Sequence, residues 1–208
     1  MNATAAIVDY DAGNLRSVQR ACHEVGLRAD IVGDPDALRA ASRVIFPGVG
    51  AAGAAMQSLK RRGLDDALIE VIARGTPTLG ICLGLQISLE YSEENDTRTL
   101  GLFPGKVRRF DLTDPNLKVP HMGWNEVRGV RAHPLLAGLT AGDEFYYVHS
   151  YFPDPADRNL VYAVSDYEKE FACALGRDNY FATQFHPEKS GRVGLRLLAA
   201  FSTWSGTC

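Results

Sequence analysis

Apolar positions in the first hundred residues follow two alternating patterns. Residues 5–10 form a short, almost continuous apolar run, which is typical of a strand buried on both faces. The apolar positions after this run recur at spacings of three and four residues, the spacing of one face of a helix. They are Leu15, Val18, Cys22 and Val25. We expect Asn14 to cap the N-terminus of this helix and Gly26 to end it.

Three further apolar runs, at residues 27–32, 43–46 and 77–81, are separated by helical patterns. Asp34 and Pro35 fit the first positions of a short helix. Two longer helical patterns precede the last of these runs, and another helix follows it directly. Strands that alternate with helices in this way predict βα units and a largely parallel sheet.

The second half of the chain has a different pattern. Its apolar segments are short and are separated by Gly, Pro and Asp turns, which predicts an antiparallel or mixed extension of the sheet. These segments are residues 106–110, 126–130, 144–148, 160–164, 171–175 and 180–185. Ser190 is expected to cap a last helix with an apolar stripe. A length of 208 residues fits one large domain, so we expect residues 1–208 to form a single α/β domain with a mostly parallel central sheet flanked by helices.

Composition and charge exclude several classes of function. With 46% hydrophobic and 23% charged residues, the chain has the composition of a globular protein. Its 22 basic and 25 acidic residues leave a net charge of −3, so no basic field attracts a nucleic acid or an anionic membrane. The longest uncharged stretch, residues 44–59, is too short and too rich in Gly and Pro to span a bilayer. We expect a soluble protein that binds neither nucleic acid nor membrane.

Cysteine usage indicates a reducing compartment. The four cysteines, Cys22, Cys82, Cys173 and Cys208, have no CxxC spacing and form no dense framework, which predicts free thiols. The segment before Asp9 lacks the basic and apolar regions of a signal peptide. We therefore expect a cytoplasmic protein without a signal peptide.

Cys82 lies between a buried strand and a helix, in the sequence Gly-Ile-Cys-Leu-Gly. Glycines at positions 80 and 84 allow the tight turn of a nucleophile elbow, here with Cys in place of Ser. Such a turn presents the sulfur at a helix N-terminus, which favours the thiolate, and the backbone N–H of Leu83 can then receive an oxyanion. A free cysteine is more often a small buried apolar residue, but the flanking glycines and the preceding strand favour the nucleophile.

A thiolate that attacks a carboxamide needs a proton donor for the leaving ammonia. Among five histidines, only His186 lies at the end of an apolar strand in a rigid polar turn. On an extended backbone His186 and Glu188 share one face, so Glu188 can hold the imidazole in one tautomer. A structural histidine at a strand end is the alternative, because the sequence alone does not bring His186 to Cys82.

Residues 48–53 match the pattern G-x-G-x-x-G between a strand and a helix, which is the pattern of a dinucleotide-binding loop. That fingerprint normally follows the first strand of its fold, whereas this loop follows the third and opens with Pro47. The competing interpretation is that the flexible backbone supplies a second oxyanion N–H, from Val49, above the cysteine.

Two other histidines stand outside these motifs. His121 and His149 have no metal-ligand spacing to other Cys, His or acidic residues, so we expect no metal site. Met122 and Trp124 lie close together on what we interpret as a loop. Either they contact a partner protein, since both residue types are enriched at interfaces, or they are buried in the core.

These motifs resemble the triad glutamine amidotransferases, a family marked by G-x-C-x-G and a distal H-P-E. The resemblance implies a class-I amidotransferase fold, no cofactor, and Cys82, His186 and Glu188 as the catalytic residues that release ammonia from glutamine. Further segments, P-G-V-G, P-H-M-G-W-N and Q-F-H-P-E-K-S-G, are similar to one subgroup, the glutaminase subunits of the histidine pathway. At Ala52 the sequence departs from the family pattern, which usually has Phe.

The subgroup implies a substrate site and a protein partner. Glutamine binding is expected at Gly50, Gln86, Ser150 and Tyr151. The resemblance also implies a heterodimer with a (β/α)8 cyclase subunit that consumes the ammonia. The expected contacts with that subunit are Asn14, Pro120, Met122 and Trp124. Two alternatives stay open: another triad amidotransferase or γ-glutamyl hydrolase, and a non-catalytic nucleotide-binding module that uses the glycine loop.

Overall fold

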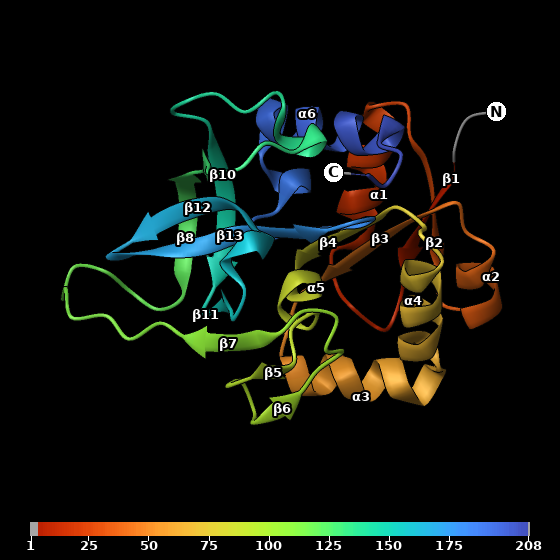
Figure 1. The fold of residues 1–208 in the computed structure, drawn as a ribbon, viewed down its shortest axis with the longest axis horizontal. Helices are drawn as coiled ribbons and strands as arrows, with labels where there is room; N and C mark the ends of the chain where they lie inside the picture. Colours follow the sequence, from red (N-terminus) through yellow and green to blue (C-terminus); the bar gives the residue numbers. More distant parts are fainter. Residues whose placement is uncertain (1–3, 208) are drawn as a thin grey trace.

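A central sheet of eight strands organises residues 4–207, the part of the chain that the computed structural model describes (Figure 1). Five neighbouring strands are parallel, and three strands with antiparallel pairing extend the sheet at one edge. In spatial order the strands are β2 (Arg28–Val32), β1 (Thr4–Val8), β3 (Arg43–Gly48), β4 (Thr78–Cys82), β14 (Tyr180–Thr183), β13 (Lys169–Arg177), β12 (Val161–Tyr167) and β9 (Arg128–Gly129). The predicted α/β class, with a mostly parallel sheet and an antiparallel extension, is confirmed.

Helices cover both faces of this sheet. Alternate residues of β1 point to opposite faces, so Ile7 packs in one apolar cluster and Val8 in another. The helices on the face of Ile7 are α1 (Leu15–Glu24) and α6 (Gly191–Thr203). The helices on the face of Val8 are α2 (Pro35–Arg39), α3 (Ala52–Arg62), α4 (Leu64–Ala73) and α5 (Leu83–Gln86). Among residues 4–207, no helix has the length and hydropathy needed to cross a membrane.

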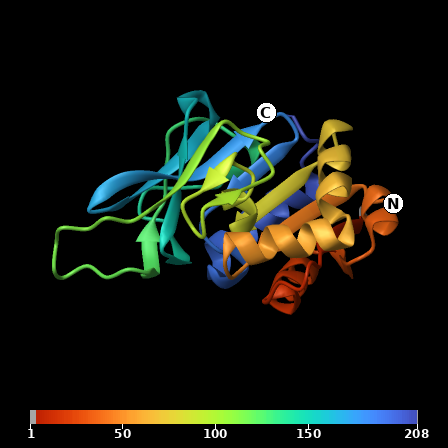
Figure 2. The ribbon, with the colours of Figure 1, turned by 90° about the horizontal axis from the view of Figure 1, so that it is seen from below.

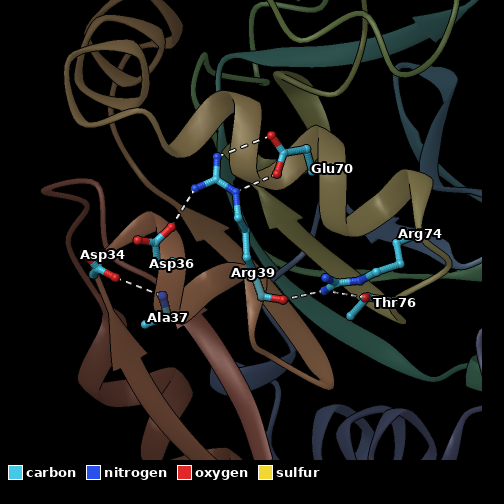
Figure 3. Close-up of polar contacts among 7 residues, drawn as sticks. All are labelled: Asp34, Asp36, Ala37, Arg39, Glu70, Arg74 and Thr76. Carbon is cyan, nitrogen blue, oxygen red and sulfur yellow. Dashed lines mark hydrogen bonds and ion pairs between the residues drawn. The ribbon is translucent and has the colours of Figure 1, made fainter.

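An ion pair joins α2 to α4 (Figure 3). Asp34 caps α2 by accepting from the Ala37 N–H at 2.8 Å, and Pro35 is the first residue of the helix, as the sequence predicts. At the other end of α2, the guanidinium of Arg39 pairs with both oxygens of Glu70 on α4, with Nε 2.5 Å from Oε2. These side chains are exposed to water, so the pair contributes little to the free energy of unfolding.

Two smaller sheets lie beside the antiparallel end of the central sheet (Figures 1 and 2). One pairs β8 (His121–Glu126) with β10 (Glu144–His149). The other contains, in order, β11 (Tyr151–Pro155), β7 (Gly105–Arg109), β5 (Tyr91–Ser92) and β6 (Thr97–Arg98). Short 3-10 helices follow as η1 (Pro134–Leu136), η2 (Arg158–Leu160) and η3 (Pro187–Lys189). The segment between β7 and β8 projects from the body of the molecule in both views.

Strand β8 corrects the interpretation of the segment around Trp124 as a loop. Its residues alternate with period two, so His121 is buried and Met122 is exposed. Pro120 and Gly123 are common turn residues, and they concealed this period in the sequence. The predicted strand at 126–130 is wrong in its bounds, because β8 ends where that segment begins and only the two-residue β9 follows. The helix expected after Cys82 is the single turn α5.

Asn14 and Ser190 occupy the expected N-cap positions of α1 and α6. The expected capping by their side chains is wrong, because neither side chain accepts a hydrogen bond from its helix. Asn14 has a φ of 71° and donates to Glu188 instead. The Ser190 hydroxyl donates to the His186 carbonyl at 2.6 Å and accepts from the Tyr146 N–H at 3.0 Å. Both side chains therefore form hydrogen bonds that hold the segment of residues 186–190, which follows β14.

Candidate active site

Cys82 ends β4 in a strained conformation, with φ 54° and ψ −104°. L-residues rarely adopt such angles, and strain of this kind is typical of functional sites. A Cβ on Gly84 would overlap the carbonyl oxygen of Phe46. A Cβ on Gly80 would lie 2.6 Å from the hydroxyl of Tyr180. The glycines therefore let neighbouring elements close around the turn, and the expected elbow is present.

The glycine loop begins beside this cysteine, because Gly48 pairs with Cys82 across the parallel strands β3 and β4. A Cβ on Gly48 would overlap the hydroxyl of Tyr10. Gly50 has a φ of 104°, in the region that favours glycine, and nothing lies within 4 Å of the position of its missing Cβ. Val49, between the two glycines, is 36% exposed. Gly48 is thus tightly packed, whereas Gly50 leaves the backbone after Val49 sterically open.

Ala52, the departure from the family pattern, is the first residue of α3 and is fully buried. Its N–H donates to Oε2 of Glu94 at 2.7 Å. A carboxylate at this end of the helix compensates the free N–H groups of the first turn. Glu94 therefore anchors the C-terminal end of the glycine loop.

His186 and Glu188 form a buried pair. Nδ1 of His186 lies 2.8 Å from Oε1 of Glu188, and both side chains are at most 1% exposed. The expected hydrogen bond is present, but the expected extended backbone is wrong, since residues 187–189 form η3. Burial disfavours the imidazolium, but the interactions with the Cys82 thiolate and then with Glu188 outweigh it and raise the pKa of His186 to about 10. The site therefore favours the imidazolium form of His186.

Asn14 reaches the same carboxylate from the start of α1. Its Nδ2 donates to Oε1 of Glu188 at 2.6 Å. This oxygen takes two hydrogen bonds, while Oε2 is buried and has no hydrogen-bond partner among residues 4–207. The sequence predicts Asn14 as a helix cap and as a partner contact, so its inward contact with Glu188 is an addition that the structure makes.

Two glutamines join the site beside the thiol. Nε2 of Gln184 lies 3.6 Å from Sγ of Cys82, and Oε1 of Gln184 accepts from Nε2 of Gln86 at 3.1 Å. Gln86 also donates to the Tyr151 carbonyl at 2.9 Å. Sequence reasoning missed Gln184. Its place two residues before His186 in the same motif was the available signal.

The remaining expected substrate and oxyanion groups belong to the backbone. Leu83 is the first residue of α5, where an N–H has no partner within the helix. The Ser150 carbonyl already accepts from the Phe110 N–H at 3.0 Å. The expected backbone groups therefore come from three separate segments, the glycine loop, the elbow and the end of β10.

Three of the four expected partner residues, Pro120, Met122 and Trp124, lie on or just before strand β8, and Asn14 lies at the start of α1. Pro120 is exposed, Met122 is 62% exposed and Trp124 is 53% exposed, so the alternative that Met122 and Trp124 are core residues is wrong. Trp124 pairs opposite Tyr146, whose carbonyl accepts from the His186 N–H at 2.9 Å. The exposed side chains of Met122 and Trp124 therefore lie on a strand that is one strand away from the candidate imidazole.

No three His, Cys, Asp or Glu side chains within residues 4–207 are arranged to hold a metal ion. Cys22 and Cys173 are buried free thiols. Cys208 lies outside the described residues.

The chain belongs to the class-I glutamine amidotransferase family, whose model matches residues 6–202, and it is a glutamine amidotransferase. Two curated relatives are named imidazole glycerol phosphate synthase subunit HisH. The relative from Nitrosococcus oceani is 51% identical over 207 residues, covering 98% of this chain and 99% of the relative. The relative from Chromobacterium violaceum is 49% identical over 208 residues, covering 97% and 98%. Among solved structures, PurLQS from Thermotoga maritima matches with a TM-score of 0.75 and 17% identity over 97% of this chain and 98% of that chain, which supports the fold.

Proposed function

We propose that the chain is the glutaminase subunit of an imidazole glycerol phosphate synthase in histidine biosynthesis. It hydrolyses glutamine to glutamate and ammonia and passes the ammonia to a separate (β/α)8 cyclase subunit. That subunit makes imidazole glycerol phosphate and aminoimidazole carboxamide ribotide. The observation that carries the proposal is the buried His186–Glu188 pair beside Cys82, in a chain about half identical to relatives of that name.

Cys82 is the nucleophile in the first half of the reaction. Its thiolate attacks the side-chain amide carbon of glutamine, and the new C–S bond turns the carbonyl oxygen into an oxyanion. When this intermediate collapses, the C–N bond breaks and His186 donates a proton to the departing nitrogen. The products are ammonia and a γ-glutamyl thioester on Cys82. The raised pKa of His186 supports this role, because it keeps the proton on the ring until the leaving group forms.

The second half of the reaction hydrolyses the thioester. The neutral imidazole of His186 takes a proton from a water molecule as the water oxygen attacks the thioester carbon. The C–S bond then breaks, which releases glutamate and restores the thiolate beside the imidazolium. Glu188 orients the imidazole through Nδ1 in both halves.

The backbone N–H groups of Leu83 and Val49 stabilise the oxyanion in both tetrahedral intermediates. Leu83 directly follows Cys82, and the loop that contains Val49 begins opposite Cys82 in the parallel register. One such donor typically contributes about 10²- to 10³-fold in turnover. The positive φ of Gly50 supports a loop that can aim the Val49 N–H at the reacting atom.

Glutamine occupies a site formed by a side chain and by backbone. The proposed contacts are Gly50, Gln86, Ser150 and Tyr151. Ammonia in neutral water is mostly ammonium and is no longer nucleophilic, so the product needs a sealed passage between two subunits. The exposed apolar strand β8 supports a heterodimer with the cyclase in which the contacts are Asn14, Pro120, Met122 and Trp124.

Residues 1–208 act as one amidotransferase domain, supported by a family match over residues 6–202. We place this domain in the cytoplasm. Support comes from the buried cysteines Cys22 and Cys173, which are free thiols and fit a reducing compartment.

Replacement of the nucleophile tests the proposal. Cys82→Ala in complex with the cyclase should abolish glutamine hydrolysis and leave the cyclase reaction intact when an ammonium salt is supplied. Cys173→Ala, which also removes a buried thiol, is the matched control and should keep glutamine hydrolysis. Substantial glutaminase activity in Cys82→Ala would overturn the assignment. If the Cys82→Ala complex showed no cyclase reaction with an ammonium salt, the proposal that the partner is a cyclase would be overturned.

A further inference from the structure

His121 and His149 form a buried pair between strand β8 and the candidate active site. They are opposite each other in the antiparallel register of β8 and β10, and each is at most 5% exposed. Nδ1 of His121 lies 2.9 Å from Nε2 of His149. The His121 ring also stacks on Tyr147 and Tyr167, with centroids 4.9 Å and 4.0 Å away. Nothing in the proposed reaction uses either imidazole.

The partners of this pair fix which nitrogen carries each proton. Nδ2 of Asn125 lies 2.8 Å from the Asp166 carbonyl, which can only accept, and 3.3 Å from Nε2 of His121. The amide nitrogen is the donor to both, so the proton of His121 sits on Nδ1. His121 then donates to Nε2 of His149, which leaves the proton of His149 on Nδ1, where it donates to the Tyr151 carbonyl at 2.7 Å. Each ring N–H in this series therefore has one acceptor, Nε2 of His149 for His121 and the Tyr151 carbonyl for His149.

Neutral rings are required for this arrangement. A proton added to Nε2 of His121 would face the Asn125 amide donor, and one added to Nε2 of His149 would face the donor Nδ1 of His121. Burial lowers the pKa of His121 to about 4. Burial also lowers the pKa of His149 to about 3; the hydrogen bond to the Tyr151 carbonyl opposes this shift, and the nearby His121 and His186 add to it. Both rings are therefore neutral at neutral pH.

The series continues from the carbonyl to the thiol. The Tyr151 carbonyl also accepts from Nε2 of Gln86, which donates to Gln184. Gln184 in turn donates to Sγ of Cys82. A continuous hydrogen-bonded path therefore runs from Asn125 on β8 to the candidate nucleophile.

We propose that His121 and His149 are positioning residues for the glutaminase reaction. They fix the Tyr151 carbonyl, and this carbonyl fixes the side chain of Gln86. The same strand that presents Met122 and Trp124 to solvent holds the first ring of the path on its buried face. A partner protein that binds Met122 and Trp124 therefore contacts the same strand that carries His121 and orients the glutamine site. This inference rests on the proposed function, because the reaction it positions is glutamine hydrolysis.

Substitution of His149 separates positioning from simple support of the fold. His149→Leu removes the donor to the Tyr151 carbonyl and should raise KM for glutamine about tenfold, the cost of one lost buried hydrogen bond, with kcat little changed. His149→Asn restores an N–H near the position of Nδ1 and should recover most of that loss. His133→Leu is the matched control, since His133 is 4% exposed and belongs to no part of the path. Kinetics are measured in the complex with the cyclase.

A purely structural role predicts a different result. It would lower Tm and the fraction of active enzyme in both His149→Leu and His133→Leu and leave KM unchanged in both. An unchanged KM in His149→Leu, or a KM in His149→Asn as high as in His149→Leu, would overturn the inference. If Cys82→Ala still hydrolysed glutamine, the proposed function would fail instead, so the two failures are distinguishable.

The tautomers provide a test that needs no variant. Long-range 1H–15N correlation spectra of the wild-type chain at neutral pH should show both His121 and His149 neutral and protonated on Nδ1. The common tautomer at His149, with the proton on Nε2, would remove the hydrogen bond from His149 to the Tyr151 carbonyl and would overturn the inference.

Discussion

Asn14 and Glu188 are 174 positions apart in the chain and are joined by a hydrogen bond of 2.6 Å, from Nδ2 of the amide to Oε1 of the carboxylate. The same oxygen accepts from Nδ1 of His186 at 2.8 Å, so the start of α1 and the helix η3 meet at one atom. Two hydrogen bonds to one oxygen hold the Glu188 carboxylate in one orientation. The carboxylate in turn orients the imidazole ring of His186. We therefore expect Asn14 to affect the reaction through Glu188 as well as any contact with a partner.

Asn14→Ala should lower kcat for glutamine about tenfold with little change in KM, because it removes a hydrogen bond to a charged group that orients the general acid. Steady-state kinetics of the complex at saturating glutamine measure this split. Asn116→Ala, which changes an exposed asparagine on the loop before β8, is the control and should match the wild type. If Asn14→Ala weakens cyclase binding and leaves kcat of the assembled complex unchanged, Asn14 is an interface residue only.

The pKa of His186 should depend more on Cys82 than on Glu188. Burial alone would lower this pKa, and the thiolate is the larger of the two interactions that raise it to about 10. A 15N titration of Cys82→Ala should therefore show His186 losing its proton at a lower pH than in Glu188→Gln. His133, whose pKa burial and then Arg131 lower to about 4, stays neutral and serves as an internal reference. The reverse order of the two variants would contradict the thiolate–imidazolium pair.

The same shift has a consequence for stability. A folded-state pKa above the unfolded value of about 6.5 means that the charged His186 stabilises the fold fully below about pH 6.5. This contribution is lost as the pH rises through about 10, the pKa of His186 in the fold. In thermal melts, the difference in Tm between the wild type and His186→Gln should therefore become smaller as the pH rises from about 6.5 to about 10. A difference that widens with pH would show that the neutral ring is the stabilising form.

Local signals in the sequence were enough to predict the elements that place the nucleophile. The elbow signal around Cys82 is contained in five consecutive residues, and the signal for the start of α2 is the pair Asp34 and Pro35. Both elements could therefore be predicted without any knowledge of tertiary contacts. The hydrogen bond between His186 and Glu188 was predicted for the same reason, although the backbone between them is a 3-10 turn. The predicted hydrogen bond is therefore correct even though the predicted backbone conformation is wrong.

Contacts between distant segments could not be predicted in this way. Periodicity indicates which face of an element is buried and leaves open which side chain it meets. Gln184 contacts Cys82 across 102 positions, and Asn14 was assigned to a helix cap because Asn is favoured there. At Trp124 the strand period was present in the sequence, but the neighbouring Pro and Gly favoured a loop.

Gly50 tests the oxyanion loop by backbone strain alone. Its φ is 104° and no atom lies within 4 Å of the position of a Cβ, so Gly50→Val introduces strain and no clash. The strain should turn the Val49 N–H away from Cys82 and lower kcat by about 10²- to 10³-fold, with a much smaller change in KM. Gly75→Val is the matched control, since Gly75 has a φ of 89° and an equally open Cβ position at the end of α4. Equal losses of kcat in the two variants would reduce the effect to general destabilisation.

Trp124 tests the coupling of the two reactions. Its ring is 53% exposed and lies 6.1 Å from the ring of Tyr146, whose carbonyl holds the His186 N–H. Large aromatic side chains seal interfaces, and a sealed contact is what keeps ammonia from becoming ammonium in water. Trp124→Ala should therefore raise the glutamine hydrolysed per imidazole glycerol phosphate formed above the wild-type ratio, while the cyclase reaction with ammonium salt is unchanged. Ile69→Ala removes a comparably exposed apolar side chain on α4 and should leave the ratio at its wild-type value. An unchanged ratio in Trp124→Ala would mean that the ammonia path is closed elsewhere on the chain.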